Sequence, residues 1–270
     1  MTNRIDEQFL QLKSEGRGGL IPFVVAGDPD LATTGELLVE LSNRGASVIE
    51  LGVPFSDPVA DGVTIQASAE RALRRPVSVG QILDLAENAR SAGCTAPIIL
   101  FSYFNPILQC GLEEFARRAR AAGLDGVLVT DLVPEEAAEF REILSKNELA
   151  QIMLAAPTSS DERLRKICAA ASGFVYAVSR AGVTGARDEV SGAAENLVAR
   201  LRRHTDLPIA VGFGISSAAQ VAATWRYADA AVVGSAIVAE MMRLAPNPDE
   251  VPPDFVARIG DFAAGLVPQS

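Results

Sequence analysis

The stretch Ser47-Val48-Ile49-Glu50-Leu51-Gly52 decides the fold: it is a short apolar run that carries one glutamate and ends on glycine. Comparable runs recur along the chain, each rich in Val, Ile, Leu or Ala and bounded by Gly, Pro, Asp or Ser. That composition is typical of buried parallel strands. The full set comprises Leu20–Ala26, Ser47–Gly52, Ala96–Phe101, Gly126–Thr130, Ala150–Ala155, Phe174–Val178, Pro208–Val211 and Asp229–Gly234.

The segments between these runs have the spacing of amphipathic helices. In Leu31–Arg44, for example, Leu37, Leu38 and Leu41 fall on one face. Comparable segments are Leu112–Ala122, Glu135–Lys146 and Asp161–Ala171. Eight buried strands, each followed by a helix and with no linker between them, predict one (β/α)8 TIM barrel that forms a single domain over residues 1–270.

Two additions to the barrel are expected. Ile5–Lys13 has the pattern of an extra helix before the first strand, and an extended loop runs from Val53 to about Val77 after the second. A doubly wound open sheet is the structural alternative. That fold usually carries an early G-x-G-x-x-G motif, and none follows Leu20–Ala26.

Composition narrows the classes of function. With 24 Lys and Arg against 34 Asp and Glu, the net charge is −10, which argues against nucleic acid and anionic membranes as partners. The hydrophobic fraction of 49% supports a large core. The charged N-terminal residues do not resemble a secretory signal, and no apolar run approaches the roughly 20 residues that a membrane span needs. A soluble, cytoplasmic protein is expected.

The chain has few histidine and cysteine residues that could bind a metal or form disulfides. His204 is the single histidine, and Cys94, Cys110 and Cys168 form no C-x-x-C pair. We therefore expect no metal site and no disulfide framework.

Two carboxylates are the best acid/base candidates. In a TIM barrel the working groups lie at the carboxyl ends of the strands. A glutamate inside a barrel strand is costly unless it is paired or functional, and burial of Glu50 should raise its pKa towards the range of proton transfer. Asp61 follows in a proline-punctuated loop that is expected to fold over the barrel mouth. A salt-bridged structural glutamate and a turn-forming aspartate are the simpler alternatives.

Glycines after the last three strands indicate a phosphate site. Backbone N–H groups in such loops, backed by a helix dipole, form an anion nest. The loops after the seventh and eighth strands contain no Lys or Arg, so binding would depend on N–H donors. The residues concerned are Gly182, Gly185, Gly212, Gly214, Gly234 and Ser235. Phe23, Leu100, Phe101 and Leu128 either wall an apolar cavity or fill the barrel core.

Five motifs resemble the signature of the tryptophan synthase α subunit family, in order, over roughly residues 5–262. Glu50-Leu51-Gly52-Val53-Pro54-Phe55-Ser56-Asp57-Pro58 with Ala60-Asp61-Gly62 is the most specific of them. The others are Ala26-Gly27-Asp28-Pro29, Asn105-Pro106-Ile107, Ser179-Arg180-Ala181-Gly182-Val183-Thr184-Gly185 and Gly212-Phe213-Gly214-Ile215-Ser216.

The resemblance implies a lyase that cleaves indole-3-glycerol phosphate to indole and glyceraldehyde 3-phosphate by a retro-aldol reaction. By the same resemblance, Glu50 is the general acid/base, Asp61 hydrogen-bonds the indole N–H, and Tyr176 lies close to the glyceryl chain. The implied phosphate-binding residues are Gly185, Phe213, Gly214, Gly234 and Ser235. The implied indole pocket consists of Phe23, Leu100, Phe101, Leu128 and Thr184.

The resemblance also implies a pyridoxal-phosphate-dependent β subunit that receives the indole, in an α2β2 heterotetramer. No cofactor is then expected in this chain itself. The implied contact residues are Pro54, Asp57, Pro58, Asn105 and Pro106. Thr130 and Val63 depart from the family pattern, since proline is frequent at both positions.

Three alternatives remain at this point. A stand-alone lyase would release free indole without a β subunit. A phosphate-sugar isomerase would explain the phosphate loops equally well, but not the stretch from Pro54 to Gly62 with its aspartate. A catalytically inactive barrel that only activates its partner would not need both Glu50 and Asp61.

Overall fold

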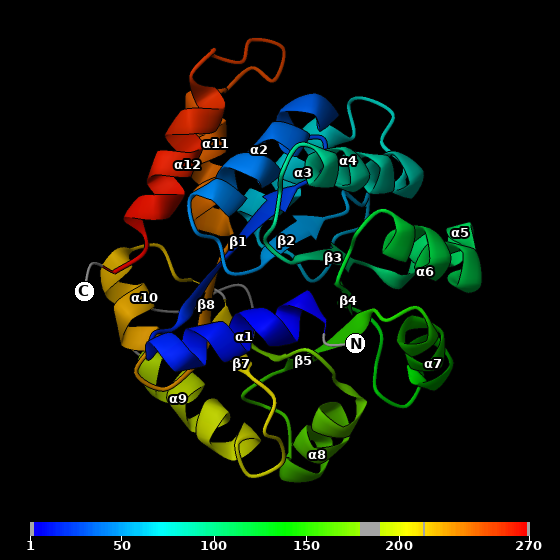
Figure 1. Ribbon diagram of the computed structural model, residues 1–270, viewed down its shortest axis with the longest axis vertical. Coiled ribbons are helices and arrows are strands. Elements are labelled where there is room, and N and C mark those ends of the chain that lie inside the picture. Colours follow the sequence, from blue (N-terminus) through cyan, green and yellow to red (C-terminus); the bar gives the residue numbers. More distant parts are fainter. Residues whose placement is uncertain (1–2, 179–189, 213, 269–270) are drawn as a thin grey trace.

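Eight parallel strands close into a barrel in the computed structural model, which describes residues 3–178, 190–212 and 214–268 (Figure 1). Each strand pairs with its neighbours in chain order, and β1 also pairs with β8. The strands are β1 Gly19–Val25, β2 Ile49–Gly52, β3 Ile98–Ser102, β4 Gly126–Val129, β5 Ala150–Ala155, β6 Val175–Val178, β7 Ile209–Gly212 and β8 Ala230–Val233. The predicted TIM barrel is confirmed.

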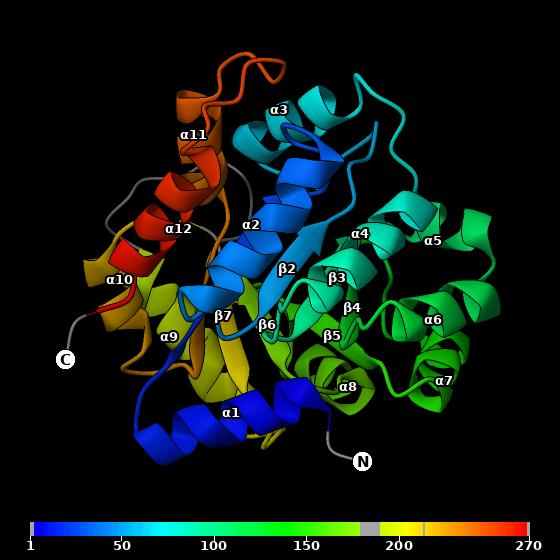
Figure 2. The same cartoon turned by 45° about the horizontal axis from the view of Figure 1, so that its top comes forward.

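Helices surround the barrel (Figures 1 and 2). Those of the outer layer are α2 Leu31–Asn43, α3 Val63–Ala72, α4 Val79–Ser91, α5 Phe104–Cys110, α6 Leu112–Ala121, α7 Ala138–Lys146, α8 Asp161–Ala170, α9 Val190–Leu201, α10 Ala218–Thr224, α11 Ser235–Leu244 and α12 Phe255–Gly265. Helix α1, Arg4–Glu15, is the additional N-terminal helix that the sequence predicts. Two helices were not predicted: α3 within the extended second loop, and α5 directly after β3.

Side chains along each strand alternate between the barrel interior and the helix layer. This alternation determines which residues of β2 face the interior. Glu50 pairs in register with Phe23 and Ile99, and these neighbouring residues pack in the interior core. Ile49 and Leu51, on either side of Glu50, belong instead to the core between strands and helices. Glu50 therefore lies on the inner face of β2, inside the barrel.

The amino ends of the strands are covered by α1, on the side of the barrel opposite α3 (Figure 2). Asn3 caps this helix by accepting a hydrogen bond from the Ile5 N–H. Its buried face packs on the barrel floor, where the Phe9 and Phe174 rings lie 5.8 Å apart. This end of the barrel is therefore closed by apolar packing.

A buried aspartate joins several elements at the same end. Asp125, which precedes β4, is 1% exposed. Its Oδ2 atom lies 2.8 Å from Arg90 Nη2 and accepts the Ile98 N–H, and its Oδ1 atom lies 2.9 Å from Arg4 Nη1. Both carboxylate oxygens are thus paired, so the charge links α1, α4 and β3.

Candidate active site

A cavity of about 80 Å³ opens at the carboxyl ends of the strands. It brings together residues from β1, β2, β3, β6 and β8, from α3, and from the loops after β2 and β7. Its lining consists of Phe23, Glu50, Asp61, Gly62, Ile65, Phe101, Tyr176, Gly214, Ile215, Val232, Gly234 and Ser235. Glu50 and Asp61, the two carboxylates that the sequence predicts, both line this cavity. Residues of β6 and of the loops after β7 and β8 line it as well.

Glu50 is buried without a partner for one of its oxygens. The residue is 1% exposed, and its Oε1 atom accepts no hydrogen bond from the residues that the structure describes. Burial disfavours the ionised form and raises the pKa of Glu50 from 4.5 to about 8. The carboxyl group is therefore mostly protonated at neutral pH, as a proton donor requires. Within the described residues no cation pairs with it, which disfavours a structural salt bridge.

Asp61 is tuned differently. Burial raises the pKa of Asp61 to about 6, and the hydrogen bond from Tyr103 opposes that rise. Tyr103 Oη donates to Asp61 Oδ2 over 3.2 Å, and its own pKa is raised to about 12, so the hydroxyl keeps its proton. At neutral pH Asp61 is mostly ionised while Glu50 is mostly protonated. A pair of carboxyl groups with separated pKa values is the usual arrangement for acid/base work.

Tyr103 is a functional candidate to which the sequence assigns no role. It follows β3, is 3% exposed and packs its ring 4.9 Å from that of Phe55. Its hydroxyl accepts the Ala60 N–H over 2.9 Å in addition to its bond with Asp61. Only the three-dimensional proximity of the second and third loops reveals this contact, because Tyr103 and Asp61 lie far apart in the sequence.

Two glycines leave room for the aromatic walls. A Cβ atom at Gly212 would lie 2.0 Å from the Tyr176 hydroxyl oxygen, and one at Gly52 would lie 2.6 Å from Phe23 Cζ. Tyr176 lies inside the barrel and is 4% exposed. Burial, with a further contribution from the Glu50 charge, raises its pKa well above 10. The phenol therefore stays neutral beside Glu50.

The predicted phosphate site is described in part. Helix α11 begins at Ser235 directly after Gly234, so its first N–H groups face the cavity end of β8. Gly214 has a φ of 81°, a left-handed conformation that favours glycine. Ser217 caps α10: its hydroxyl accepts the Gln220 N–H. Gly185, Phe213 and Thr184 lie outside the described residues.

The apolar wall requires one correction. Phe23 and Phe101 line the cavity, with ring centroids 5.3 Å apart, and Leu128 packs with them in the interior core. Leu100 instead belongs to the core between strands and helices. The expectation that Leu100 walls the pocket is therefore wrong. Adjacent residues of a strand point to opposite faces, so Phe101 and Leu100 cannot both face the interior.

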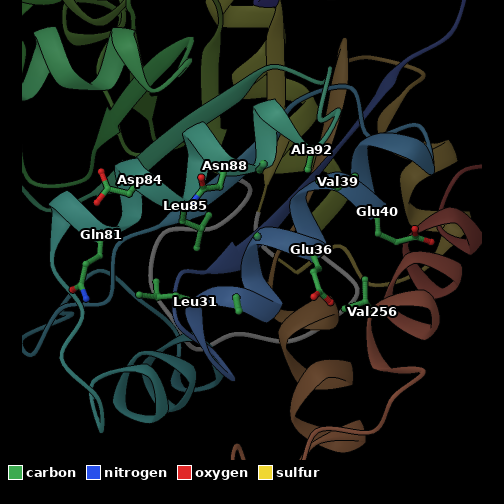
Figure 3. A pocket seen from close by; sticks show the side chains of 13 residues that line it. Leu31, Glu36, Val39, Glu40, Gln81, Asp84, Leu85, Asn88, Ala92 and Val256 are labelled. Carbon is green, nitrogen blue, oxygen red and sulfur yellow. The ribbon is translucent and has the colours of Figure 1, made fainter.

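A larger groove of about 570 Å³ lies on the outer layer, between α2 and α4 and beside Val256 of α12 (Figure 3). Its apolar floor includes Leu85, and Glu36 lies on its rim. Neither Glu50 nor Asp61 lines it. Across the described residues, no group of three or more His, Cys, Asp or Glu side chains has the arrangement of a metal site. The strand-end cavity is therefore the candidate active site.

The fold and this cavity define the class: a TIM-barrel enzyme with two differently tuned carboxyl groups beside the start of helix α11. Residues 9–265 match the family model for the tryptophan synthase alpha chain. The chain belongs to the tryptophan synthase alpha chain family. Members of this family are lyases of the tryptophan synthase reaction, in which the alpha subunit cleaves indole-3-glycerol phosphate.

Similar proteins cover nearly the whole chain. The tryptophan synthase alpha chain of Caulobacter sp. is 46% identical over 98% of this chain and 96% of its own. That of Geobacter sulfurreducens is 50% identical over 87% of this chain and 89% of its own. Among solved structures, tryptophan synthase subunit alpha of Legionella pneumophila has a TM-score of 0.88 at 33% identity, covering 98% of this chain and 97% of its own. A chain of Mycobacterium tuberculosis tryptophan synthase has a TM-score of 0.87 at 36% identity, with 100% of both chains covered.

No helix among the described residues is both long and apolar enough to cross a membrane.

Proposed function

We propose that this chain cleaves indole-3-glycerol phosphate to indole and glyceraldehyde 3-phosphate, with Glu50 and Asp61 as its two catalytic carboxyl groups. The observation that carries the proposal is the shared cavity. It holds one buried carboxyl with a pKa of about 8 and another with a pKa of about 6. At neutral pH the site therefore offers both a proton donor and an anion, which the retro-aldol reaction requires.

The reaction follows from these two protonation states. The protonated Glu50 carboxyl gives its proton to carbon 3 of the indole, and the ring nitrogen then gains positive charge. The Asp61 carboxylate accepts a hydrogen bond from the ring N–H and stabilises that charge. The ionised Glu50 next removes the proton of the side-chain hydroxyl. The bond between carbon 3 and the side chain breaks, its electron pair restores the aromatic ring, and the aldehyde is released. Glu50 ends protonated, so the proton balance closes.

The remaining predicted residues would hold the substrate. Phe23, Phe101 and Leu128 supply apolar surface for the indole ring, and Tyr176 lies beside Glu50 where the glyceryl chain would lie. Gly214, Gly234 and Ser235 offer backbone N–H groups to the phosphate, together with the predicted Gly185 and Phe213. Thr184 is assigned to the indole pocket by resemblance alone. In this proposal Glu50 makes both proton transfers, so the chain needs no cofactor of its own.

The proposed partner is a pyridoxal-phosphate-dependent β subunit in an α2β2 assembly. The predicted contact residues Pro54, Asp57, Pro58, Asn105 and Pro106 follow β2 and β3. Exposed apolar side chains occur on the same rim of the barrel: Val59 is 86% exposed, Leu108 49% and Val133 37%. Large exposed apolar groups that cluster on one rim support a docking face. The cytoplasmic location stays a prediction.

Replacement of each carboxyl group tests the proposed chemistry. We expect Glu50→Gln and Asp61→Asn each to lower indole release from indole-3-glycerol phosphate by at least about a hundredfold. For the unaltered protein, kcat/KM should fall above about pH 8, where Glu50 loses its proton, and below about pH 6, where Asp61 gains one. Glu36→Gln, on the exposed side of α2, is the control and should keep full activity.

Near-normal turnover by Glu50→Gln would contradict the mechanism. The partner is tested separately by mixing the chain with a tryptophan synthase β subunit and measuring both co-purification and the rate of indole release. A stand-alone lyase would show neither binding nor stimulation.

A further inference from the structure

The second loop, which carries Asp61, is continuous with α3. This helix begins at Val63, and the side chain of Gln66 lies one turn into it. The Gln66 Nε2 atom donates to the Asp61 carbonyl over 2.9 Å and to the Pro58 carbonyl over 3.3 Å. The Asp61 N–H also donates to the Pro58 carbonyl, over 3.0 Å. One amide group therefore spans both ends of the turn that presents the catalytic carboxylate.

Helix α3 is itself fixed by a buried ionic cluster. Asp28, in the loop after β1, is fully buried. Its Oδ1 atom lies 3.0 Å from Arg71 Nε, and its Oδ2 atom accepts the Ser68 hydroxyl over 2.5 Å. Arg71, 8% exposed, also donates from Nη2 to the Ala245 carbonyl over 2.8 Å. The cluster thus ties α3 to the end of β1 and to the end of α11.

The cost of this cluster calls for an explanation. A buried ion pair loses the hydration of both charges, and apolar residues of similar size often stabilise a fold equally well. In some proteins such ionic groups instead fix one geometry of the packed elements. Ser68 and Arg71 lie on the helix that carries Gln66, so the orientation of α3 determines where the Gln66 amide meets the second loop.

We propose that Gln66 is a positioning residue for Asp61, and that the Asp28–Ser68–Arg71 cluster fixes α3 so that Gln66 can hold the turn. The inference rests on the proposed function, since the position of Asp61 matters for turnover only if its carboxylate meets the substrate. Tyr103 holds the same turn from the β3 side, through Ala60 and the Asp61 carboxylate. Gln66 acts from the opposite side, on the backbone carbonyls.

Loss of the amide should affect chemistry more than binding. Gly214 and Gly234, which are assigned to phosphate binding, follow β7 and β8, and within the described residues neither forms a hydrogen bond with the Gln66 side chain. A carboxylate displaced by about 1 Å can cost up to a hundredfold in rate. We therefore expect Gln66→Leu to lower kcat for indole release by about tenfold to a hundredfold. KM for indole-3-glycerol phosphate should change less than about threefold.

Gln11→Leu is the matched control. It makes the same chemical change on α1, at the opposite end of the barrel, where the Gln11 side chain donates only to the exposed Glu15 among the described residues. This variant should keep the unaltered kcat. Near-ultraviolet circular dichroism of every variant shows whether the fold is intact. If Gln66→Leu does not fold, Ser68→Ala takes its place, with an expected several-fold loss of kcat.

A double variant separates positioning from a general structural effect. If Gln66 acts through Asp61, then Gln66→Leu should cause no further loss in an Asp61→Asn background. A full additional loss there, or an unchanged kcat for the single variant, would overturn the inference. An Asp61→Asn variant with normal turnover would instead overturn the proposed function. The two failures are therefore distinguishable in one set of assays.

Discussion

Glu50 and Asp125 are equally buried acids at opposite ends of the barrel, and they have opposite surroundings. Each is 1% exposed. Asp125 is paired with Arg90 and Arg4 and accepts a backbone N–H, whereas Glu50 has an oxygen with no partner among the described residues. A buried charge needs compensation, and an uncompensated acid keeps its proton instead. The arginines make Asp125 a structural link, whereas no arginine of the described residues pairs with Glu50, so this carboxyl group keeps its proton at neutral pH.

Asp28 is an intermediate case. It is paired with Arg71 and Ser68, yet burial outweighs both partners and raises the pKa of its carboxyl group. Burial alone therefore does not identify a catalytic acid. The informative combination is a buried carboxyl, a missing partner and a position on a cavity, and Glu50 has all three.

The largest expected effect is on the pH dependence of stability. Folded Glu50 has a pKa of about 8 against 4.5 in the unfolded chain, so the folded state holds a proton that the unfolded state has lost. Stability is therefore lost as the pH rises from about 4.5 to 8. Glu50→Gln removes this titration and should be more stable than the unaltered protein by up to about 5 kcal/mol at pH 9. Urea unfolding at pH 5, 7 and 9 measures the difference. If the free energies of unfolding of the two proteins changed with pH in the same way, Glu50 would not have the raised pKa.

The second largest expected effect is the loss of stability when Asp125 loses one of its two arginine partners. Arg90→Met leaves the buried carboxylate without its most buried cation, and we expect it to lower the free energy of unfolding by about 3–5 kcal/mol. Arg117→Met is the control, because Arg117 pairs with Glu114 on an exposed face of α6. Thermal and urea unfolding at pH 7 report both. A loss below about 1 kcal/mol would show that Asp125 tolerates isolation as Glu50 does.

The smallest effect concerns the second arginine. The Arg4 side chain is 45% exposed, so solvent screens its ion pair with Asp125. We expect Arg4→Met to cost at most about 1 kcal/mol. The difference from the unaltered protein should shrink at high salt, since exposed charges are screened. A loss of stability as large as that of Arg90→Met would contradict this, because Arg4 would then stabilise the Asp125 carboxylate as strongly as Arg90 does.

Much of the fold follows from composition, because each buried strand is a continuous apolar run bounded by turn residues. The same property hides which residues face the interior. In β3 both faces are apolar, so nothing in the sequence separates Leu100 from Phe101. In β2, by contrast, Glu50 is the one charged residue, so the sequence alone singles it out as a candidate. The sequence analysis also does not single out Val232 of β8, which lines the cavity, because its neighbours in the strand are apolar as well.

Contacts between distant loops could not be predicted. Helix α3 lies in a stretch that the sequence presents only as an extended loop, so Ile65 and the Gln66 contacts were not foreseen. Tyr103 meets Asp61 only because β2 and β3 are neighbours in the barrel. The sequence therefore proposes candidate catalytic residues, whereas the side chains that contact and hold them depend on which strands are neighbours in the closed barrel.

Gly52 and Gly212 have a practical consequence for anyone who wishes to redesign the substrate range. No larger residue fits at either position without displacing Phe23 or Tyr176. Saturation libraries at these glycines would therefore return mainly damaged proteins. Trimming Phe23 would enlarge the cavity from within while leaving both glycines in place, so an engineer seeking a roomier catalyst should begin there.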